Sequence, residues 1–385
     1  MRTLIPYARQ NIDDEDIQTV VEILQSDWLT QGPVVPEFEQ ACSQYVKANY
    51  GVAVSSATAA LHLSCLALGV GPGDRIWTSP NTFVASSNCA LYCGAQVDFV
   101  DIDKDTYNFS VDAFEEKLKI AEKANKLPKV VVPVHFAGQS CDMKAIKALA
   151  DQYEIKIIED ASHAIGGRYL DNAIGSCQYS DITVFSFHPV KIITTAEGGL
   201  ALTNSEKLQN KLGLLRSHGI TRDQLHLTKT SEGPWYYQQI ELGFNYRLTD
   251  LQAGIGLSQL KKIDTFIAKR NQIAKRYDEE LKDLPVITPW QSKNCYNAYH
   301  LYTIELKQHD RKEIFEQLRQ KQIGVNVHYI PVHTQPYYQS LGFKIGDFPN
   351  AERYYARTIS LPMYYSLSQE QQSFVIDTLT QILAS

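Results

Sequence analysis

The feature that most constrains the fold is an alternation of short apolar runs with helical patterns through the first half of the chain. The runs are typical of buried strands and lie at Val97–Val100, Val130–Val134, Lys156–Ile158 and Ile182–Phe187. Between them, Val111–Ala124 and Met143–Tyr153 have the periodicity of helices. Because parallel strands need long crossovers, usually helices, the alternation predicts an α/β fold with a mostly parallel sheet between helices.

The pattern changes near residue 250, where Leu251–Leu281 is a long helical pattern without a strand. Beyond it, strand-like and helical segments predict a smaller α+β unit, with its parts at Tyr302–Leu306, Arg311–Gln320, Gly324–Tyr329 and Gln369–Leu383. A chain of 385 residues is long enough for two cores. We therefore expect a large domain over residues 1–250 and a small C-terminal domain over residues 251–385.

Composition and charge argue against several classes of protein. The formal net charge is −6 and no block of lysine or arginine stands out, so neither nucleic acid nor an anionic membrane is an expected partner. The N-terminus lacks the apolar run of a signal peptide, and no segment approaches the length of a membrane span. The seven cysteines include no C-x-x-C pair and are interpreted as reduced thiols. We expect a cytoplasmic protein without a metal site.

A single lysine, Lys191, stands between the apolar strand Ile182–Phe187 and a turn that ends in Gly198 and Gly199. An amine in so apolar a setting loses hydration of its charged form, which lowers its pKa and makes it a nucleophile. Such an amine can form a Schiff base with the aldehyde of pyridoxal phosphate. An ordinary surface lysine at the end of a strand fits the same residues equally well.

Small polar residues mark a second candidate site, at Ser55 and Ser56. They lie between a strand that ends at Val54 and a helix predicted over Ala57–Gly69. A helix N-terminus offers free N–H groups and a partial positive charge, which suit a phosphate group, and Thr58 adds a hydroxyl. A simple N-cap, in which a serine starts the helix, explains the same residues.

Two further segments place polar or aromatic groups just after predicted strands. Asp160 follows the strand Lys156–Ile158, so its carboxylate can pair with a protonated pyridine nitrogen at the carboxyl end of the sheet. His163, three residues on, can reach the ring's phenolic oxygen, and Phe83 can lie on the face of the ring. Taken singly, a helix-capping aspartate, a core histidine and a core phenylalanine are the plainer interpretations.

In this chain order the motifs resemble those of the DegT/DnrJ/StrS-type sugar aminotransferase family. Members of that family are fold type I enzymes that use pyridoxal phosphate to aminate keto sugars joined to a nucleotide. The segments that carry the resemblance span nearly the whole chain and are Asp27–Pro33, Ser56–Leu61, Glu159–Ala164, Ser186–Gly199, Gly243–Leu248 and His328–His333. The resemblance thus implies an aminotransferase with a large pyridoxal phosphate domain and a smaller C-terminal domain.

The resemblance also implies roles for particular residues. Lys191 would hold the cofactor covalently and be the catalytic residue, Asp160 would pair with the pyridine nitrogen, and His163 would lie near the ring hydroxyl. Phe83 would stack on the ring. The phosphate would be bound by groups from three segments, namely the Ala57 and Thr58 amides, the Ser186 hydroxyl, and Asn245 from the neighbouring subunit of a homodimer. The family's contacts to the sugar nucleotide are matched here by Tyr7, Asp27, Trp28, Leu29, Thr30, Asn326, Val327, His328 and Tyr329.

Several segments resemble one branch of the family, the aminotransferases of pseudaminic-acid biosynthesis. These segments are Ser162–Ala164, Phe185–His188, Ile193–Gly199 and Leu215–Gly219. The branch implies L-glutamate as the amino donor and C4 of a UDP-linked 4-keto-6-deoxy-N-acetyl-L-altrosamine as the acceptor. Arg216 and Arg247 are both candidates for binding the donor's carboxylate, and each can equally form a structural ion pair.

Three alternatives remain open at this point. The acceptor can be another nucleotide-linked keto sugar, such as a gluco-configured UDP or dTDP sugar. A pyridoxamine-dependent sugar dehydratase would carry histidine in place of Lys191, and a non-catalytic regulator would not need the set of Lys191, Asp160 and Ser186. The chain also departs from many relatives in reading Ser-Ala-Thr at its phosphate turn, and in having His163 where they have glutamine, which leaves the charge of that residue open.

Overall fold

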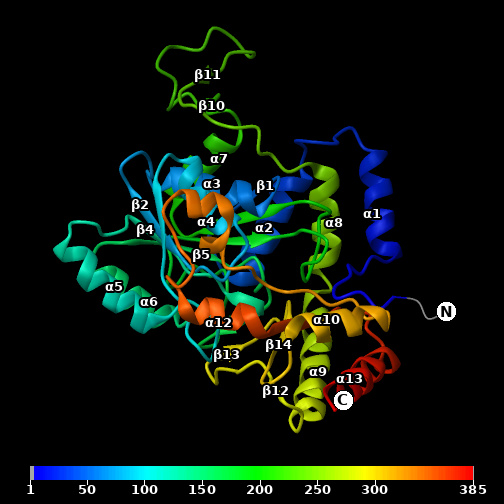
Figure 1. Cartoon of the computed structure of the whole chain (residues 1–385). Coiled ribbons are helices and arrows are strands. Elements are labelled where there is room, and N and C mark those ends of the chain that lie inside the picture. Colours follow the sequence, from blue (N-terminus) through cyan, green and yellow to red (C-terminus); the bar gives the residue numbers. More distant parts are fainter. Residues whose placement is uncertain (1–3, 385) are drawn as a thin grey trace.

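The computed structural model describes residues 4–384, which form an α/β structure around a seven-stranded sheet (Figure 1). The strand order is β1-β9-β8-β5-β4-β2-β3, and within this sheet only β9 runs antiparallel to its neighbours. The strands are β1 (Tyr50–Val54), β2 (Arg75–Thr78), β3 (Gln96–Phe99), β4 (Val130–Val132), β5 (Lys156–Asp160), β8 (Ile182–Ser186) and β9 (Gly199–Thr203). The expected fold class, with a mostly parallel sheet, is therefore confirmed.

Helices cover both faces of this sheet, which explains its continuous apolar strands. In β4, Val130 and Val132 face the cluster that α3 and α4 complete, whereas Val131 faces the cluster of α5 and α6. All three valines are fully buried. The helices of this part are α2 (Val34–Val46), α3 (Ala57–Ala67), α4 (Ala85–Tyr92), α5 (Val111–Lys123), α6 (Met143–Gln152) and α7 (Glu206–Arg216), with a 3-10 turn, η1, at Phe136–Gly138.

The long helical pattern predicted over Leu251–Leu281 is two helices, α8 (Asp250–Leu260) and α9 (Ile263–Leu281). The break lies at Lys261 and Lys262, where the Lys262 ammonium pairs with Asp13 and Asp16 at the start of α1 (Asp14–Leu24). Apolar residues continue at helical spacing on both sides of this break, so apolar spacing alone predicts one continuous helix.

A second, three-stranded sheet with the order β12-β14-β15 forms the C-terminal part of the described residues, together with four α-helices and a 3-10 turn, η2. Residues 324–329 form no strand, and only a single bridge joins Asn326 to Ser360. The expected boundary near residue 250 stays a prediction. The elements are β12 (Val286–Ile287), β14 (Tyr302–Leu306), β15 (Thr358–Leu361), α10 (Arg311–Gln320), η2 (Val332–Thr334), α11 (Pro336–Ser340), α12 (Pro349–Arg357) and α13 (Gln369–Leu383).

Two small sheets complete the structure. One is formed by β13 (Cys295–Tyr296), β6 (Arg168–Tyr169) and β7 (Asn172–Ala173). The other is a hairpin of β10 (Ile220–Thr221) and β11 (Gln238–Gln239), which projects from the body at the top of Figure 1. We call residues 217–245 the arm.

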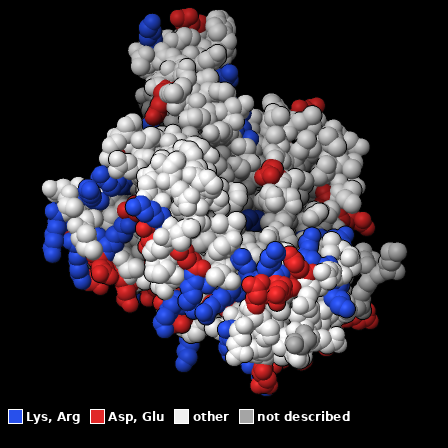
Figure 2. Space-filling view, in the orientation of Figure 1, with Lys and Arg blue, Asp and Glu red and all other residues white. Residues whose placement is uncertain are grey.

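The surface and helices bear on the partners considered above. On the face shown in Figure 2, lysine and arginine are interspersed with aspartate and glutamate rather than gathered in one basic patch. Among residues 4–384, no helix is both long and apolar enough to cross a bilayer.

Candidate active site

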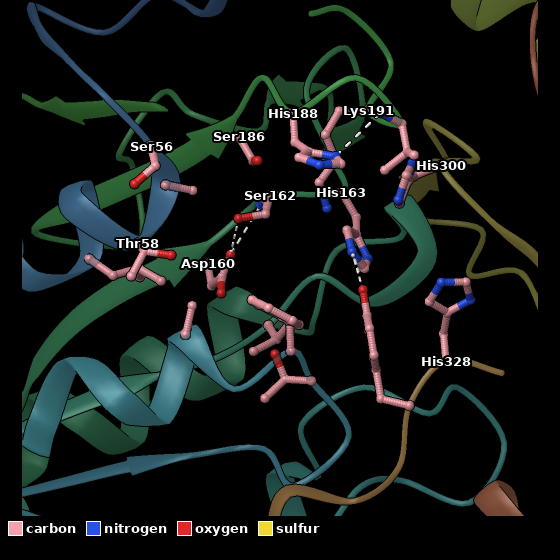
Figure 3. A pocket seen from close by; sticks show the side chains of 18 of the residues that line it. Ser56, Thr58, Asp160, Ser162, His163, Ser186, His188, Lys191, His300 and His328 are labelled. Carbon is pink, nitrogen blue, oxygen red and sulfur yellow. Dashed lines mark hydrogen bonds between the residues drawn. The ribbon is translucent and has the colours of Figure 1, made fainter. Parts of the chain in front are cut away.

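The candidate site is a cavity of about 460 Å³ at the carboxyl ends of β5 and β8. Open α/β sheets bind ligands at this edge, because the connecting loops and helix N-termini converge there. Figure 3 shows Ser56 and Thr58 on one side, Asp160 near the middle, and Lys191 with His163 and His300 on the other side. The cavity is lined by Tyr7, Ser56, Ala57, Thr58, Leu61, Thr82, Phe83, Ala85, Val134, Asp160, Ser162, His163, Ser186, His188, Val190, Lys191, Glu197, His300, His328 and Tyr329.

Lys191 lies on the turn that follows β8 and lines the cavity. Its backbone N–H donates to the His188 carbonyl at 2.8 Å, which fixes the turn. Burial lowers the pKa of its amino group to about 8, although the nearby Asp160 carboxylate opposes this shift. No hydrogen-bond acceptor among residues 4–384 holds the amino group, so the amine is free to act as a nucleophile near neutral pH.

The start of α3 forms an anion site facing the same cavity. Ser56 caps the helix by accepting a hydrogen bond from the Ala59 N–H at 3.1 Å, which leaves the Ala57 and Thr58 N–H groups without helical partners. Gly199 of β9 packs so closely against this turn that a Cβ there would lie 2.4 Å from a Ser56 backbone carbon. The turn therefore offers free amides at a position that only a glycine neighbour permits.

Asp160 ends β5 and points into the cavity with its carboxylate fixed by two serines. The Ser86 hydroxyl donates to Oδ2 at 2.6 Å, and the Ser162 hydroxyl and N–H donate to Oδ1 at 2.6 and 3.1 Å. These bonds hold the carboxylate in one orientation while leaving further lone pairs to accept from a bound cation or N–H group. Ser86 belongs to α4, so the pairing comes from the tertiary fold.

His163 is neutral, and its hydrogen bonds fix its tautomer. Burial and the nearby Lys191 hold its pKa well below its usual range. The backbone N–H of Ala137 donates to Nδ1 at 3.3 Å, so the ring proton lies on Nε2, which donates to the Tyr329 hydroxyl oxygen at 3.0 Å. The Tyr329 hydroxyl proton is then available to a molecule bound in the cavity.

Three more histidines line the cavity, namely His188, His300 and His328, and sequence reasoning predicted only His328 as a site residue. His328 accepts or donates through Nδ1 to the Ser360 hydroxyl at 2.7 Å, and burial lowers its pKa to about 3. His300 was missed, although its ring centre lies 4.4 Å from that of His163 and its buried Nδ1 has no partner among the described residues. Its position just before β14 carries no local motif, so only the folded chain brings it to Lys191.

The structure brings ten of the predicted site residues to the cavity wall, which are Tyr7, Ala57, Thr58, Phe83, Asp160, His163, Ser186, Lys191, His328 and Tyr329. Phe83 is 59% exposed, so the face of its ring is accessible for stacking on a planar ligand. Seven others do not line the cavity of this chain, namely Asp27, Trp28, Leu29, Thr30, Asn245, Asn326 and Val327. The roles of all these residues stay predictions.

Neither candidate arginine lines the cavity. Arg216 is held by the Glu39 carboxylate and by the Ala53 carbonyl, which makes it a structural ion pair. The Arg247 side chain is half-buried and forms no hydrogen bond or ion pair with residues 4–384. Among these residues no cluster of histidine, cysteine, aspartate or glutamate could hold a metal ion.

A poorly hydrated lysine amine, a fixed carboxylate and free helix amides in one cavity define a site for a phosphorylated aldehyde cofactor. The model of the DegT/DnrJ/EryC1/StrS aminotransferase family matches residues 10–380, and the chain belongs to this family. The expected family and enzyme class are thereby confirmed.

Individual relatives match over nearly their full length. The spore coat polysaccharide biosynthesis protein SpsC of Bacillus subtilis is 40% identical over 98% of this chain and 97% of its own. A UDP-4-amino-4,6-dideoxy-N-acetyl-beta-L-altrosamine transaminase of Campylobacter jejuni is 38% identical over 99% of this chain and 98% of its own.

Solved structures agree with the family. The PMP form of the putative sugar aminotransferase Spr1654 from Streptococcus pneumoniae has a TM-score of 0.92 and 30% identity over 99% of both chains, and the same protein is known in a PLP form. Helicobacter pylori PseC, an aminotransferase involved in the biosynthesis of pseudoaminic acid, has a TM-score of 0.90 and 31% identity over 99% of this chain and 100% of its own. These structures bear out the expected cofactor, pyridoxal phosphate.

Proposed function

We propose that this chain transfers the amino group of L-glutamate to the C4 keto carbon of a UDP-linked 4-keto-6-deoxy-N-acetyl hexosamine of L-altro configuration, in the biosynthesis of pseudaminic acid. The observation that carries the chemistry is the Lys191 amine, with its pKa of about 8, in one cavity with the fixed Asp160 carboxylate. The substrate rests on the relatives: the transaminase of Campylobacter jejuni is named for the altrosamine, and PseC is described as taking part in the biosynthesis of pseudoaminic acid.

The cavity residues fit pyridoxal phosphate. The free Ala57 and Thr58 amides, with the Ser186 hydroxyl, would bind the phosphate, and the exposed Phe83 ring would cover one face of the pyridine. Asp160 would accept from the pyridine N–H and so keep that nitrogen protonated. When bound, the cofactor supplies an aldehyde and an electron-withdrawing ring that carry the amino group between the two substrates.

Lys191 would perform the proton transfers. Its amine would take the proton from Cα of glutamate and return it at the cofactor carbon C4′, and then run the reverse transfer for the sugar. An amine with a pKa near 8 suits both directions, because neither protonation state is strongly favoured near neutral pH. The neutral His163 and Tyr329 pair would supply the hydroxyl proton of Tyr329 to an oxygen of the bound ring or sugar.

The proposal includes a homodimer with shared sites. Asn245 lies at the base of the arm, is exposed, and does not reach the cavity of its own chain. The arm exposes large apolar side chains that a monomer would leave in water, with Leu225, Trp235 and Leu242 at 90, 70 and 78% exposure. An arm that packs on a second copy would bury these side chains and bring Asn245 to the partner's phosphate site. We propose that the enzyme works in the cytoplasm.

Substrate choice is tested by incubating the enzyme with glutamate and one of three keto sugars. These are the UDP-linked L-altro sugar, its UDP-linked gluco-configured counterpart and a dTDP-linked gluco sugar, and 2-oxoglutarate is measured by mass spectrometry. We expect kcat/KM for the L-altro sugar to be at least about tenfold above the others, since a site built around one stereocentre rejects the other. If the enzyme aminates only a gluco-configured sugar, the proposed L-altro substrate is wrong but the proposed aminotransferase reaction stands.

The cofactor attachment has its own test. Borohydride treatment of the purified protein, followed by digestion and mass spectrometry, should find the reduced cofactor on Lys191 alone. A label on another lysine, or none, would show that the site has been assigned wrongly. A labelled protein that aminates none of the three sugars would favour the regulator.

A further inference from the structure

A buried histidine–glutamate pair lies behind the cavity, between β5 and the turn that follows β4. His135 and Glu159 are 0 and 5% exposed, and neither lines the cavity. Their side chains meet at 2.7 Å, between His135 Nε2 and Glu159 Oε2. The other carboxylate oxygen of Glu159 accepts from the Ser180 hydroxyl at 2.5 Å and from the Thr183 hydroxyl at 3.2 Å. A buried carboxylate needs such partners, and together they hold the Glu159 side chain in one position.

The backbone on both sides of this pair leads towards the cavity. Asp160 directly follows Glu159 in β5, and its carbonyl accepts from the His135 N–H at 3.0 Å. The His135 ring also closes the loop from residue 135 to residue 141, because the Cys141 N–H donates to its Nδ1 at 3.2 Å. Since Nδ1 accepts, the ring proton lies on Nε2 and is donated to Glu159. One histidine ring thus joins β5 to this loop.

The same loop carries the N–H group that fixes the tautomer of His163, since the Ala137 N–H donates to His163 Nδ1 at 3.3 Å. Ala137 has a φ of 57°, a left-handed conformation that alanine adopts only where its surroundings hold it. Two buried side chains hold the loop here. The His135 ring closes it, and Asn108 Oδ1 accepts from the Phe136 N–H at 2.8 Å. The direction of the Ala137 N–H therefore depends on His135.

We propose that His135, oriented by Glu159, is a positioning residue for the aminotransferase reaction. It aims the Ala137 N–H at His163 Nδ1, which keeps the ring proton of His163 on Nε2. That proton is donated to the Tyr329 hydroxyl oxygen, and the Tyr329 proton is left for a bound molecule. Without the Ala137 N–H, His163 can carry its proton on Nδ1 and accept from Tyr329 instead, because the two neutral tautomers exchange donor and acceptor.

The inference rests on the proposed function, because it takes Tyr329 to donate to a molecule in the cavity. It does not depend on which keto sugar is the acceptor. Its tests are therefore a measurement on the cofactor-free protein, which needs no turnover, and a kinetic comparison.

The chain offers a matched control in a second buried histidine–glutamate pair. His333 is fully buried, its Nε2 lies 2.8 Å from Glu352 Oε1, and neither residue lines the cavity. Unlike His135, its Nδ1 has no partner among residues 4–384. Glutamine in place of either histidine keeps a donor for the carboxylate, but only His135→Gln removes an acceptor that a backbone N–H uses. The two variants share a loss of packing and differ in the loop.

The first measurement is the tautomer of His163 in the cofactor-free protein at neutral pH. Long-range 1H–15N spectra of protein labelled with 15N-histidine show which ring nitrogen carries the proton, and the His163 signals are identified by their loss in His163→Gln. We expect the proton on Nε2 in wild type and in His333→Gln, and a mixture of both tautomers in His135→Gln. A wild-type His163 protonated on Nδ1, which needs no variant to detect, or an unchanged tautomer in His135→Gln would overturn the proposal.

The second measurement is turnover with L-glutamate and whichever of the three keto sugars the wild-type enzyme aminates. In His135→Gln, kcat should fall at least about tenfold while KM for the sugar stays within about threefold, because a proton donor matters most where charge develops in the transition state. In His333→Gln, kcat should stay within about twofold of wild type. Equal losses in both variants would overturn the proposal, because His135 would then contribute only to stability. If wild type aminates none of the sugars, the proposed function fails, and the tautomer of His163 still decides this inference.

Discussion

The folded chain buries the Lys191 amine away from the water and hydrogen-bond acceptors that would stabilise its charged form. The side chain lines the cavity with the neutral rings of His163, His300 and His328, and the Asp160 carboxylate favours its charged form. A buried lysine of this kind lowers the free energy of unfolding, because its ammonium is better hydrated in the unfolded chain than in the folded one.

This loss of stability can be measured in the cofactor-free protein. Below a pH of about 8, the folded protein holds a poorly hydrated charge, so Lys191→Met should raise the free energy of unfolding by about 2 kcal/mol at pH 7. Between pH 8 and the ordinary lysine pKa of 10.5, the unfolded wild-type chain binds more protons than the folded one, so wild-type stability rises with pH. The gap between the two proteins should therefore close above that range.

Urea unfolding at pH 7 and above pH 10.5 provides the comparison. Lys275→Met is the matched control, since the Lys275 side chain is 77% exposed, and its effect should stay below about 0.5 kcal/mol. A Lys191→Met protein that is less stable than wild type at pH 7 would mean that the amine is well accommodated in its charged form.

Asp160 supports a second prediction at this scale. Asp160→Asn keeps the size of the side chain but removes the negative charge that would hold a pyridine nitrogen protonated. Turnover should fall about 10²–10⁴-fold, while the visible absorbance of bound cofactor persists because the phosphate contacts are untouched. Asp181→Asn is the control: Asp181 lies at the opposite end of the same strands, where it accepts from the Ile157 N–H. Equal losses in both variants would point to a general folding defect.

Sequence reasoning identified site residues that lie in local motifs and missed those that only the fold supplies. Lys191 and Asp160 could be predicted because each follows an apolar strand, and strand ends converge at one edge of a parallel sheet. His300 and Ser86 could not, since neither is marked by its neighbours: one precedes a strand of the C-terminal sheet and the other lies inside α4. Burial and unpaired ring nitrogens are properties of the folded chain.

At the scale of elements, the close approach of β9 to the start of α3 determines whether the anion site can exist. Gly199→Ala would place a Cβ 2.4 Å from the Ser56 backbone carbon and 2.5 Å from the Ala57 nitrogen. The two elements must then separate, so we expect a loss of about 1–3 kcal/mol in stability and at least about tenfold weaker retention of the cofactor.

Gly213→Ala is the control for that substitution. Gly213 lies inside α7, and a Cβ there would meet nothing within 4 Å. This variant should gain about 0.5–1 kcal/mol from better helix propensity and retain the cofactor normally. Both proteins are compared by urea unfolding and by the cofactor left after dialysis. Normal retention in Gly199→Ala would show that the phosphate does not depend on this turn.

The elements themselves were predicted where one physical signal dominates. Strands such as β4 and β8 were predicted because both of their faces are buried, so their apolar runs are uninterrupted. The antiparallel strand β9 (Gly199–Thr203) was not predicted. The break between α8 and α9 at Lys261 and Lys262 was not predicted, since apolar residues continue at helical spacing on both sides of it. Apolar periodicity alone therefore does not reveal such a break.

At the scale of the whole molecule, the arm indicates that the site of a single chain lacks Asn245. The cavity wall of one chain contains Lys191 but not Asn245, and Asn245 lies at the base of an arm that exposes Trp235 and Leu242 to water. Apolar side chains at such exposure are expected at an interface rather than on a free surface. A shared site therefore predicts that two defective subunits can complement each other.

Co-expression of Lys191→Ala with Asn245→Asp tests this directly. Each homodimer should be strongly impaired, since the first lacks the amine and the second places a negative charge beside the phosphate. In a mixed dimer, one site combines the intact Lys191 of one subunit with the intact Asn245 of the other. With statistical mixing, about a quarter of wild-type activity should return. If Asn245 served its own subunit's cavity, every site in the mixture would carry one defect and no activity would return, because each intact group would then sit beside its own subunit's mutation.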